Sequence, residues 1–297
     1  MVTVSTLSGM PSASLRRLPG GDGVRLAVEE HGPARAPAVV FAHGFGQTRA
    51  AWRSALVELA AAGWRALAYD ARGHGDSDRL ASGDYRVDQF VDDLGIVCAE
   101  APSPPVVVGA SMGGLVGLAM AAREPAHCRA LVLVDITPRW EPAGVARIVE
   151  FMRAHPDGFA DYAEAADAIA AYLPHRGTRR SRERLASLLV AAADGRLHWH
   201  WDPRMLAPIA EDSVRHQDDL FEAARRIRVP TLLISGAASD VVSTDTIAEF
   251  LELVPHARHV TVPQATHMVA GDENRAFSAH VFDFLRSLPA RAVQRDT

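Results

Sequence analysis

The stretch VVVGASMGG, residues 106–114, decides the fold that this sequence predicts. Three valines run into a turn in which Ser111 lies between Gly109 and Gly113, and an apolar, alanine-rich segment follows. An unbroken apolar run is typical of a strand buried on both faces of a parallel sheet. A strand that turns sharply into a helix places the turn residue above the carboxyl edge of the sheet, where open α/β sheets bind ligands. Glycine on either side suits such a turn, because Cβ atoms there would collide with the strand and the helix.

Strand-like and helix-like segments alternate on both sides of this stretch. A hairpin around PGGDG opens the chain, and unbroken apolar runs then alternate with amphipathic ones. This rhythm predicts an α/β fold with a mostly parallel central sheet of about eight strands flanked by helices. It stops between residues 137 and 226, where alanine-rich helical sequence with aromatics predicts a helical cap inserted after the sixth strand. The predicted domains are therefore a core of residues 1–136 and 227–297 and a cap of residues 137–226. Predicted strands and helices outside the cap are PAVVFAHG, 50–62, WRALAYD, 87–101, PPVVVGAS, 112–123, RALVLVDI, RVPTLLISG, 245–254, ARHVTVP and about 274–287.

Composition excludes several classes of function. The chain has 297 residues, a formal net charge of -5 and scattered arginines, so no basic face for nucleic acid is expected. It contains no lysine, which excludes a Schiff base, a Walker phosphate loop and a Ser-Lys dyad. Cys98 and Cys128 lack the CxxC spacing of a structural zinc site, and neither a metal nor a cofactor is predicted. No signal-like start or membrane-length apolar run is present, so we expect a cytoplasmic protein without membrane contact.

A serine hydroxyl is a poor nucleophile unless a base takes its proton, so Ser111 predicts a histidine later in the chain. His267 meets this need, because it follows the last predicted strand and therefore lies at the carboxyl edge of the sheet. The base in turn requires a carboxylate. Asp240, four residues beyond Gly236, is the preferred acid and completes the order Ser, Asp, His. Asp135, which ends the strand LVLVD, is the alternative. The backbone N–H of Met112, at a helix N-terminus, is expected to point at whatever the serine attacks.

Other histidines and acids are interpreted as structural. His43 is assigned to loop packing, because a base is already present. The loop DARGHGDSD has acids and a histidine close together, but its glycines and its place after a strand favour a structural loop over a metal site. LHWHWDP carries His198 and His200 without an evident third zinc ligand, so packing or pocket lining in the cap is expected.

In these motifs the sequence resembles the α/β-hydrolase fold superfamily, among its members with a helical cap. The resemblance extends from FAHGFG through YDARGHGDSD, GASMGG, LVLVDITPR and PTLLISGAASD to ATHMVAGD, which is nearly the whole chain. It implies that the backbone N–H of Phe45 is a second oxyanion-hole donor beside that of Met112. Epoxide hydrolases and haloalkane dehalogenases of this fold carry an aspartate where this chain has Ser111, so alkyl-enzyme chemistry is disfavoured.

A serine with an oxyanion hole suits acyl transfer on a small-molecule carboxylic ester or related carbonyl substrate. The expected enzyme is therefore a carboxylesterase-like serine hydrolase. Trp140, Trp199 and Trp201 of the cap are candidates for the pocket wall. A cofactor-free haloperoxidase or perhydrolase and a small-molecule receptor of the same fold are the alternatives. The bond type, whether ester, lactone, thioester, amide or carbon-carbon, and the oligomeric state stay open.

Overall fold

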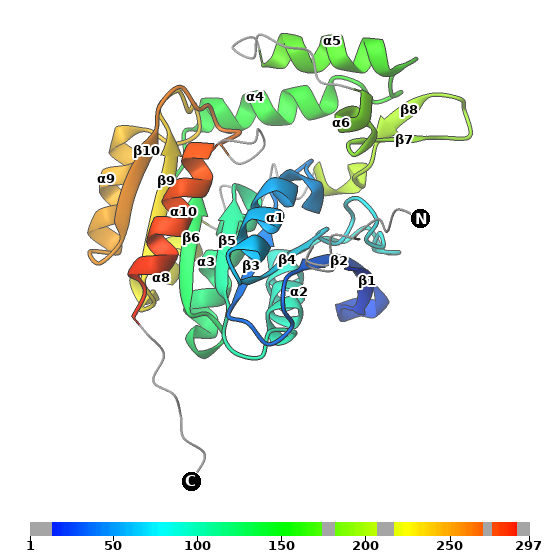
Figure 1. Ribbon diagram of the computed structural model, residues 1–297. Helices are drawn as coiled ribbons and strands as arrows, with labels where there is room; N and C mark the ends of the chain where they lie inside the picture. Colours follow the sequence, from blue (N-terminus) through cyan, green and yellow to red (C-terminus); the bar gives the residue numbers. More distant parts are fainter. Residues whose placement is uncertain (1–13, 174–181, 207–216, 270–274, 290–297) are drawn as a thin grey trace, which may run out of the picture.

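The main sheet has eight strands in the order β1-β2-β4-β3-β5-β6-β9-β10 (Figure 1). The structure is a computed structural model that describes residues 14–173, 182–206, 217–269 and 275–289. β1 pairs antiparallel with β2 and β2 antiparallel with β4, whereas every other pairing in this sheet is parallel. The predicted mostly parallel sheet of about eight strands is confirmed. The strands are β1 (Ser14–Pro19), β2 (Arg25–His31), β3 (Ala38–Ala42), β4 (Arg65–Tyr69), β5 (Val106–Ala110), β6 (Ala130–Val134), β9 (Thr231–Gly236) and β10 (Arg258–Val262).

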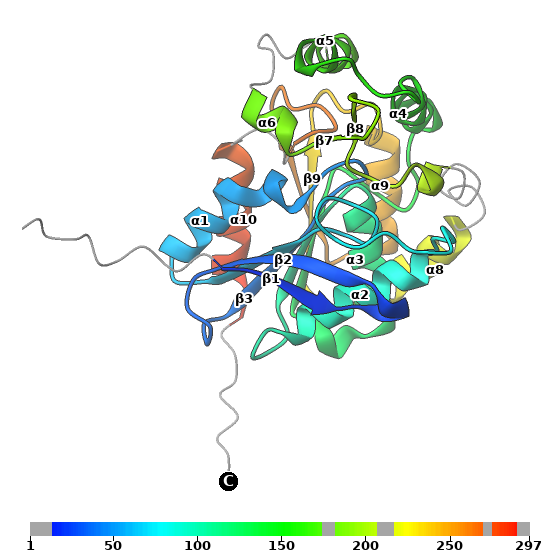
Figure 2. The same cartoon turned by 90° about the vertical axis from the view of Figure 1, so that its right-hand side faces the viewer.

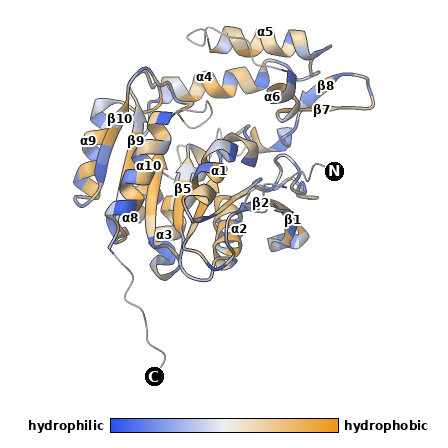
Figure 3. Cartoon of the chain, in the orientation of Figure 1, coloured by the Kyte–Doolittle hydropathy of each residue, from blue (hydrophilic) through white to orange (hydrophobic). Residues whose placement is uncertain are grey.

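Helices cover both faces of this sheet (Figures 1 and 2). Alternate residues of a strand point to opposite faces. In β3, Val39 belongs to the buried cluster that includes residues of α1 and α10, and Val40 to the cluster that includes residues of α2, α3, α8 and α9. The central strands β3, β5 and β6 are buried at every residue and are therefore apolar throughout, as the hydropathy colours show (Figure 3). The helices are α1 (Arg53–Ala61), α2 (Val87–Ala99), α3 (Met112–Arg123), α8 (Gln217–Arg226), α9 (Thr244–Leu253) and α10 (Arg275–Ser287), with short 3-10 turns η1 (Gly21–Gly23), η2 (Arg49–Trp52) and η3 (Pro125–His127).

The segment between β6 and α8 lies over one end of the sheet (Figure 1). It has a small core of its own around Phe159, Ile169 and Leu197. The predicted helical cap also contains a two-stranded hairpin, because the β-favouring Leu and Trp of one strand pair with LVA of the other. The elements are α4 (Pro142–Arg153), α5 (Tyr162–Tyr172), α6 (Arg182–Ala186), β7 (Leu189–Ala191), β8 (Leu197–Trp199) and η4 (Pro203–Met205).

Helix α8 lies within the predicted cap of residues 137–226 and packs against α3 of the core. Leu220, Ala223 and Ala224 belong to the same buried cluster as α3 and the sheet. The cap boundary at residue 226 stays a prediction. Among the helices that the structure describes, none has the length and apolar character needed to cross a bilayer.

Candidate active site

Ser111 occupies a strained turn between β5 and α3. Its φ is 48° and its ψ is -119°, a conformation that costs a non-glycine residue about 1–3 kcal/mol. The flanking glycines permit the turn. A Cβ on Gly109 would lie 2.3 Å from the carbonyl oxygen of Gly113, and one on Gly113 would lie 2.4 Å from that of Ala42. The predicted strand, sharp turn and helix are therefore present, with the serine at the carboxyl end of β5.

His267 lies in the loop after β10 and faces this serine. Its Nε2 is 3.1 Å from Ser111 Oγ, within hydrogen-bond reach, although the two residues are far apart in sequence. The predicted proximity of serine and histidine is thus found in the structure. The other ring nitrogen, Nδ1, lies 2.8 Å from Oδ2 of Asp135. A carboxylate accepts hydrogen bonds only, so Nδ1 carries the proton and Nε2 is free to accept one from the serine.

The acid that contacts His267 is Asp135, and the prediction that Asp240 takes this place is wrong. Asp135 directly follows β6, the neighbour of β5 in the sheet, and its side chain is fully buried. It also accepts hydrogen bonds from the backbone N–H of Gly236, at 2.6 Å, and from Ser239 Oγ, at 2.5 Å.

The end of β9 and the loop after it present these two donors to the site, whereas Asp240 of the same loop points outward. Asp240 binds the guanidinium of Arg147 on α4, with Oδ2 2.7 Å from Nε and 2.5 Å from Nη2. A signal for Asp135 was available in the sequence, because this residue directly follows the strand next to the strand that ends before Ser111.

The two backbone segments proposed for an oxyanion hole converge on Ser111. A Cβ on Gly44 would lie 3.3 Å from the Cβ of Ser111, so the loop after β3 runs against the serine. Phe45 follows Gly44 in this loop. Met112 is the first residue of α3, where backbone N–H groups have no partner within the helix. Two N–H donors are therefore carried by the chain segments nearest to the serine.

A cavity of about 310 Å³ opens at the serine. Ser111 and His267 line it from the core, and apolar residues of α4, α5 and β8 line it from the inserted segment. Of the three predicted pocket tryptophans, Trp199 lines this cavity. Trp140 and Trp201 are instead buried in the core cluster, where Trp201 packs on Phe45 with ring centroids 5.1 Å apart. The larger apolar lining residues are Phe45, Ile148, Phe151, Met152, Ile169, Tyr172, Leu173, Leu188, Trp199 and Met268.

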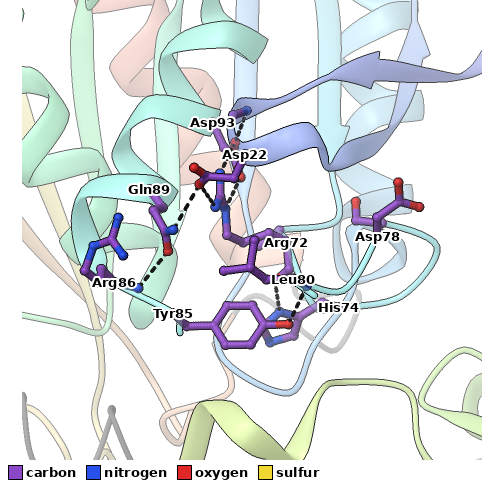
Figure 4. Close-up of polar contacts among 12 residues, drawn as sticks. Asp22, Arg72, His74, Asp78, Leu80, Tyr85, Arg86, Gln89 and Asp93 are labelled. Carbon is purple, nitrogen blue, oxygen red and sulfur yellow. Dashed lines mark hydrogen bonds and ion pairs between the residues drawn. The ribbon is translucent and has the colours of Figure 1, made fainter. Parts of the chain in front are cut away.

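The loop after β4, residues 70–78, is held by buried ion pairs. Arg72 is buried between two carboxylates, with Nε 2.7 Å from Asp93 Oδ2 and Nη1 2.8 Å from Asp22 Oδ2 (Figure 4). Desolvation raises the pKa of Asp93, and the Arg72 guanidinium opposes that rise. Asp70 pairs with Arg49. These acids have arginine partners, which fits the structural interpretation of DARGHGDSD.

His43, His198 and His200 have different surroundings in the structure. His43 is buried and bonded to backbone groups of Gly44 and Ala71, as expected of a loop-packing residue. His198 pairs with Asp194 near the surface, whereas His200 turns inward and is 4% exposed.

Residues 37–273 match the family model described as the alpha/beta hydrolase fold. A 3-hydroxybutyrate-oligomer hydrolase of Cupriavidus necator is 30% identical over 257 residues, which is 82% of this chain and 87% of that protein. An esterase of Mycobacterium tuberculosis is 30% identical over 81% of this chain and 80% of its own. The crystal structure of E-2-(acetamidomethylene)succinate hydrolase superimposes with a TM-score of 0.81 at 25% identity, covering 93% of this chain and 100% of that one.

Proposed function

This chain belongs to the alpha/beta hydrolase family, and on that premise we propose that it is a serine hydrolase working by acyl transfer. The observation that carries the proposal is the continuous contact from Ser111 Oγ to His267 Nε2 and from His267 Nδ1 to Asp135. This arrangement has the three parts that serine acyl transfer needs, namely a nucleophile, a base and an acid that orients the base. The relatives named above are an esterase and hydrolases, which agrees with this chemistry.

The reaction proceeds in two halves. Ser111 Oγ attacks the carbonyl carbon while His267 Nε2 takes the hydroxyl proton, and Asp135 stabilises the imidazolium that forms. The negative oxygen of the tetrahedral intermediate is held by the N–H groups of Phe45 and Met112. The intermediate collapses to an acyl-enzyme, and the leaving alcohol takes the proton from His267. Water then attacks the acyl-enzyme with His267 as base, which releases the acid and restores the serine.

The cavity supports a small, largely apolar substrate. Its volume of about 310 Å³ lies at the lower end of small-molecule sites, and most of its side chains are aliphatic or aromatic. We therefore propose a carboxylesterase-like activity on esters of short or medium chain length. Helices α4 and α5 supply much of the wall, so the inserted segment selects the acyl or alcohol group.

A fluorophosphonate probe tests the nucleophile. The wild type should gain one label, mapped to the Ser111 peptide by mass spectrometry, and Ser111→Ala should gain none. Ser235→Ala is the matched control, because Ser235 Oγ lies on β9 beside His259 and away from the cavity. Unchanged labelling of Ser111→Ala would overturn the assignment.

Turnover separates the enzyme from the alternatives. We expect multiple turnovers of p-nitrophenyl acetate and butyrate by the wild type and none by Ser111→Ala. Stoichiometric binding of esters without turnover would point to a receptor. Halogenation with hydrogen peroxide, acetate and bromide that exceeds the rate of ester hydrolysis would point to a perhydrolase, whose peracetic acid oxidises the bromide.

A further inference from the structure

Three buried histidines hold the loop after β3, residues 44–47, by its backbone. His43 Nδ1 lies 2.8 Å from the carbonyl oxygen of Gly44. His74 Nε2 lies 3.3 Å from the amide nitrogen of Gly46, and His200 Nε2 lies 3.3 Å from the carbonyl oxygen of Gly46. The ring centroids are 5.0 Å apart for His43 and His74 and 5.9 Å apart for His74 and His200. Each of three successive peptide units in the loop thus has one imidazole bound to it.

The second contact of each ring decides where its proton lies. His43 Nε2 accepts the N–H of Ala71 at 2.9 Å, so Nδ1 carries the proton and donates to Gly44. His200 Nδ1 accepts the N–H of Gly75 at 2.8 Å, so Nε2 donates to Gly46. His74 is the reverse case, because its Nδ1 faces the carbonyl oxygen of Arg72 at 3.2 Å and its Nε2 accepts the N–H of Gly46. Every contact is satisfied when all three rings are neutral.

Burial favours that neutral state. His43, His74 and His200 are 1%, 0% and 4% exposed. Desolvation lowers the pKa of His43, holds that of His74 well below its usual value and lowers that of His200 to about 3. The three rings therefore act as fixed hydrogen-bonding groups at neutral pH.

The loop after β4 holds His74 in place beneath the loop of residues 44–47. The carbonyl oxygen of Arg72 accepts a hydrogen bond from His74 Nδ1–H, and the guanidinium of Arg72 is fixed between Asp22 and Asp93 (Figure 4). His74 belongs to the same loop and packs edge-on against Phe45, with ring centroids 5.4 Å apart.

His200 comes from the inserted segment, which contacts the connection between β4 and α2, residues 70–86, at several points. The N–H of Asp202 donates to the carbonyl of Gly73 at 2.8 Å, and Tyr85 donates its hydroxyl proton to Asp202 at 2.7 Å. Arg79 Nη2 donates to the backbone carbonyls of His200 and Trp201. The side chain of His200 is thus delivered to Gly46 by a segment outside the sheet.

From these contacts we propose that His200 is a positioning residue for the oxyanion hole. A trans peptide is planar, so its carbonyl and N–H point in opposite directions. His43 binds the carbonyl oxygen of Gly44, so the N–H of Phe45 in the same peptide unit points away from His43. His74 and His200 bind the N–H and the carbonyl of Gly46, and this keeps the next two peptide units from rotating and turning the Phe45 N–H out of place. The inserted segment therefore contributes to transition-state binding as well as to the pocket wall. This inference rests on the proposed function.

Two substitutions of His200 test whether this residue positions the oxyanion hole or only attaches the inserted segment to the core. Glutamine places an amide nitrogen near the Nε2 position and can still donate to Gly46, whereas asparagine places an oxygen near Nδ1 and keeps only the contact with Gly75. Direct loss of an oxyanion donor lowers kcat about 10^2- to 10^3-fold. A displaced donor should cost less, so we expect His200→Asn to lower kcat about 10- to 30-fold with KM changed less than about threefold. His200→Gln should recover most of the activity.

The measurements are kcat and KM on p-nitrophenyl acetate, the rate of fluorophosphonate labelling of Ser111, and the melting temperature. His198→Asn is the control, because it lies two residues away and pairs with Asp194 near the surface. Equal activity of wild type and His200→Asn, with the wild type labelled at Ser111, would overturn this inference alone. If the loss of kcat in the asparagine and glutamine variants only follows the fall in their melting temperatures, His200 merely attaches the inserted segment to the core, and this result would also overturn the inference. A wild type that is neither labelled nor active would instead remove the proposed function, and this inference with it.

Discussion

The loops after β6 and after β9 leave the same edge of the sheet from neighbouring strands, and each carries an aspartate. Asp135 is fully buried and receives hydrogen bonds from a backbone N–H, a serine hydroxyl and His267. Asp240 is 34% exposed at its side chain and receives an arginine of α4. Arg147 also lies over the ring of Tyr172, which lines the cavity. The two aspartates are the same residue type and follow neighbouring strands, so neither feature distinguishes them. They differ because several hydrogen-bond donors converge on Asp135 in a buried place, whereas Asp240 binds Arg147 of α4 at a partly exposed one.

The strongest test of this difference is Asp135→Asn. Asparagine can still accept from the Gly236 N–H through its Oδ1, and its amide nitrogen in the place of Oδ2 can donate to Ser239 Oγ, so the fold should be kept. The same amide would face His267 Nδ1 and favour the wrong tautomer. The equivalent change in a serine protease lowers kcat about 10^4-fold, and we expect a fall of about 10^3- to 10^4-fold here. Ester hydrolysis and the melting temperature measure the two effects. A loss below tenfold would show that Asp135 does not orient the base.

A smaller effect is expected from Ser239→Ala, which changes the β9 loop at its contact with Asp135. The substitution removes one hydrogen bond to the carboxylate, and such charged bonds contribute about 1.5–3 kcal/mol. Because two other donors remain, we expect kcat to fall about tenfold with KM unchanged. Ser235→Ala, on β9 beside His259, is the control for stability. Identical kinetics in the two variants would contradict a role for Ser239 in holding the acid.

The smallest effect is expected from Asp240→Asn. A partly exposed ion pair contributes about 0.2–1 kcal/mol, so kcat should change less than about threefold. A double-mutant cycle with Arg147→Gln, read by urea unfolding, should give a coupling energy below about 1 kcal/mol. Preference for ester chain length should shift in both single variants, since Arg147 stacks on Tyr172. A fall in kcat as large as that of Asp135→Asn would reverse the assignment of the two acids.

Much of the core could be predicted from the pattern of residues along the chain. The runs around Val40, Val107 and Val132 are apolar without interruption, because helices cover the sheet on both faces. The predicted helix over residues 112–123 agrees with α3 at both ends. The hairpin in the inserted segment was less accessible, since its strands have only three residues each and too little sequence for a clear period.

The sequence by itself determined the parallel sheet, the turn at Ser111 and the place of His267, because each depends on local pattern and on which end of a strand a residue follows. Only the tertiary structure decided between Asp135 and Asp240, and only it brought His200 to Gly46. Both outcomes depend on how side chains turn within loops, and that direction is set by partners distant in sequence: Gly236, Ser239 and Arg147 for the acids, and Gly75 and Gly46 for the histidine. Hydrogen bonds of this kind form between chain segments that only the folded sheet brings together.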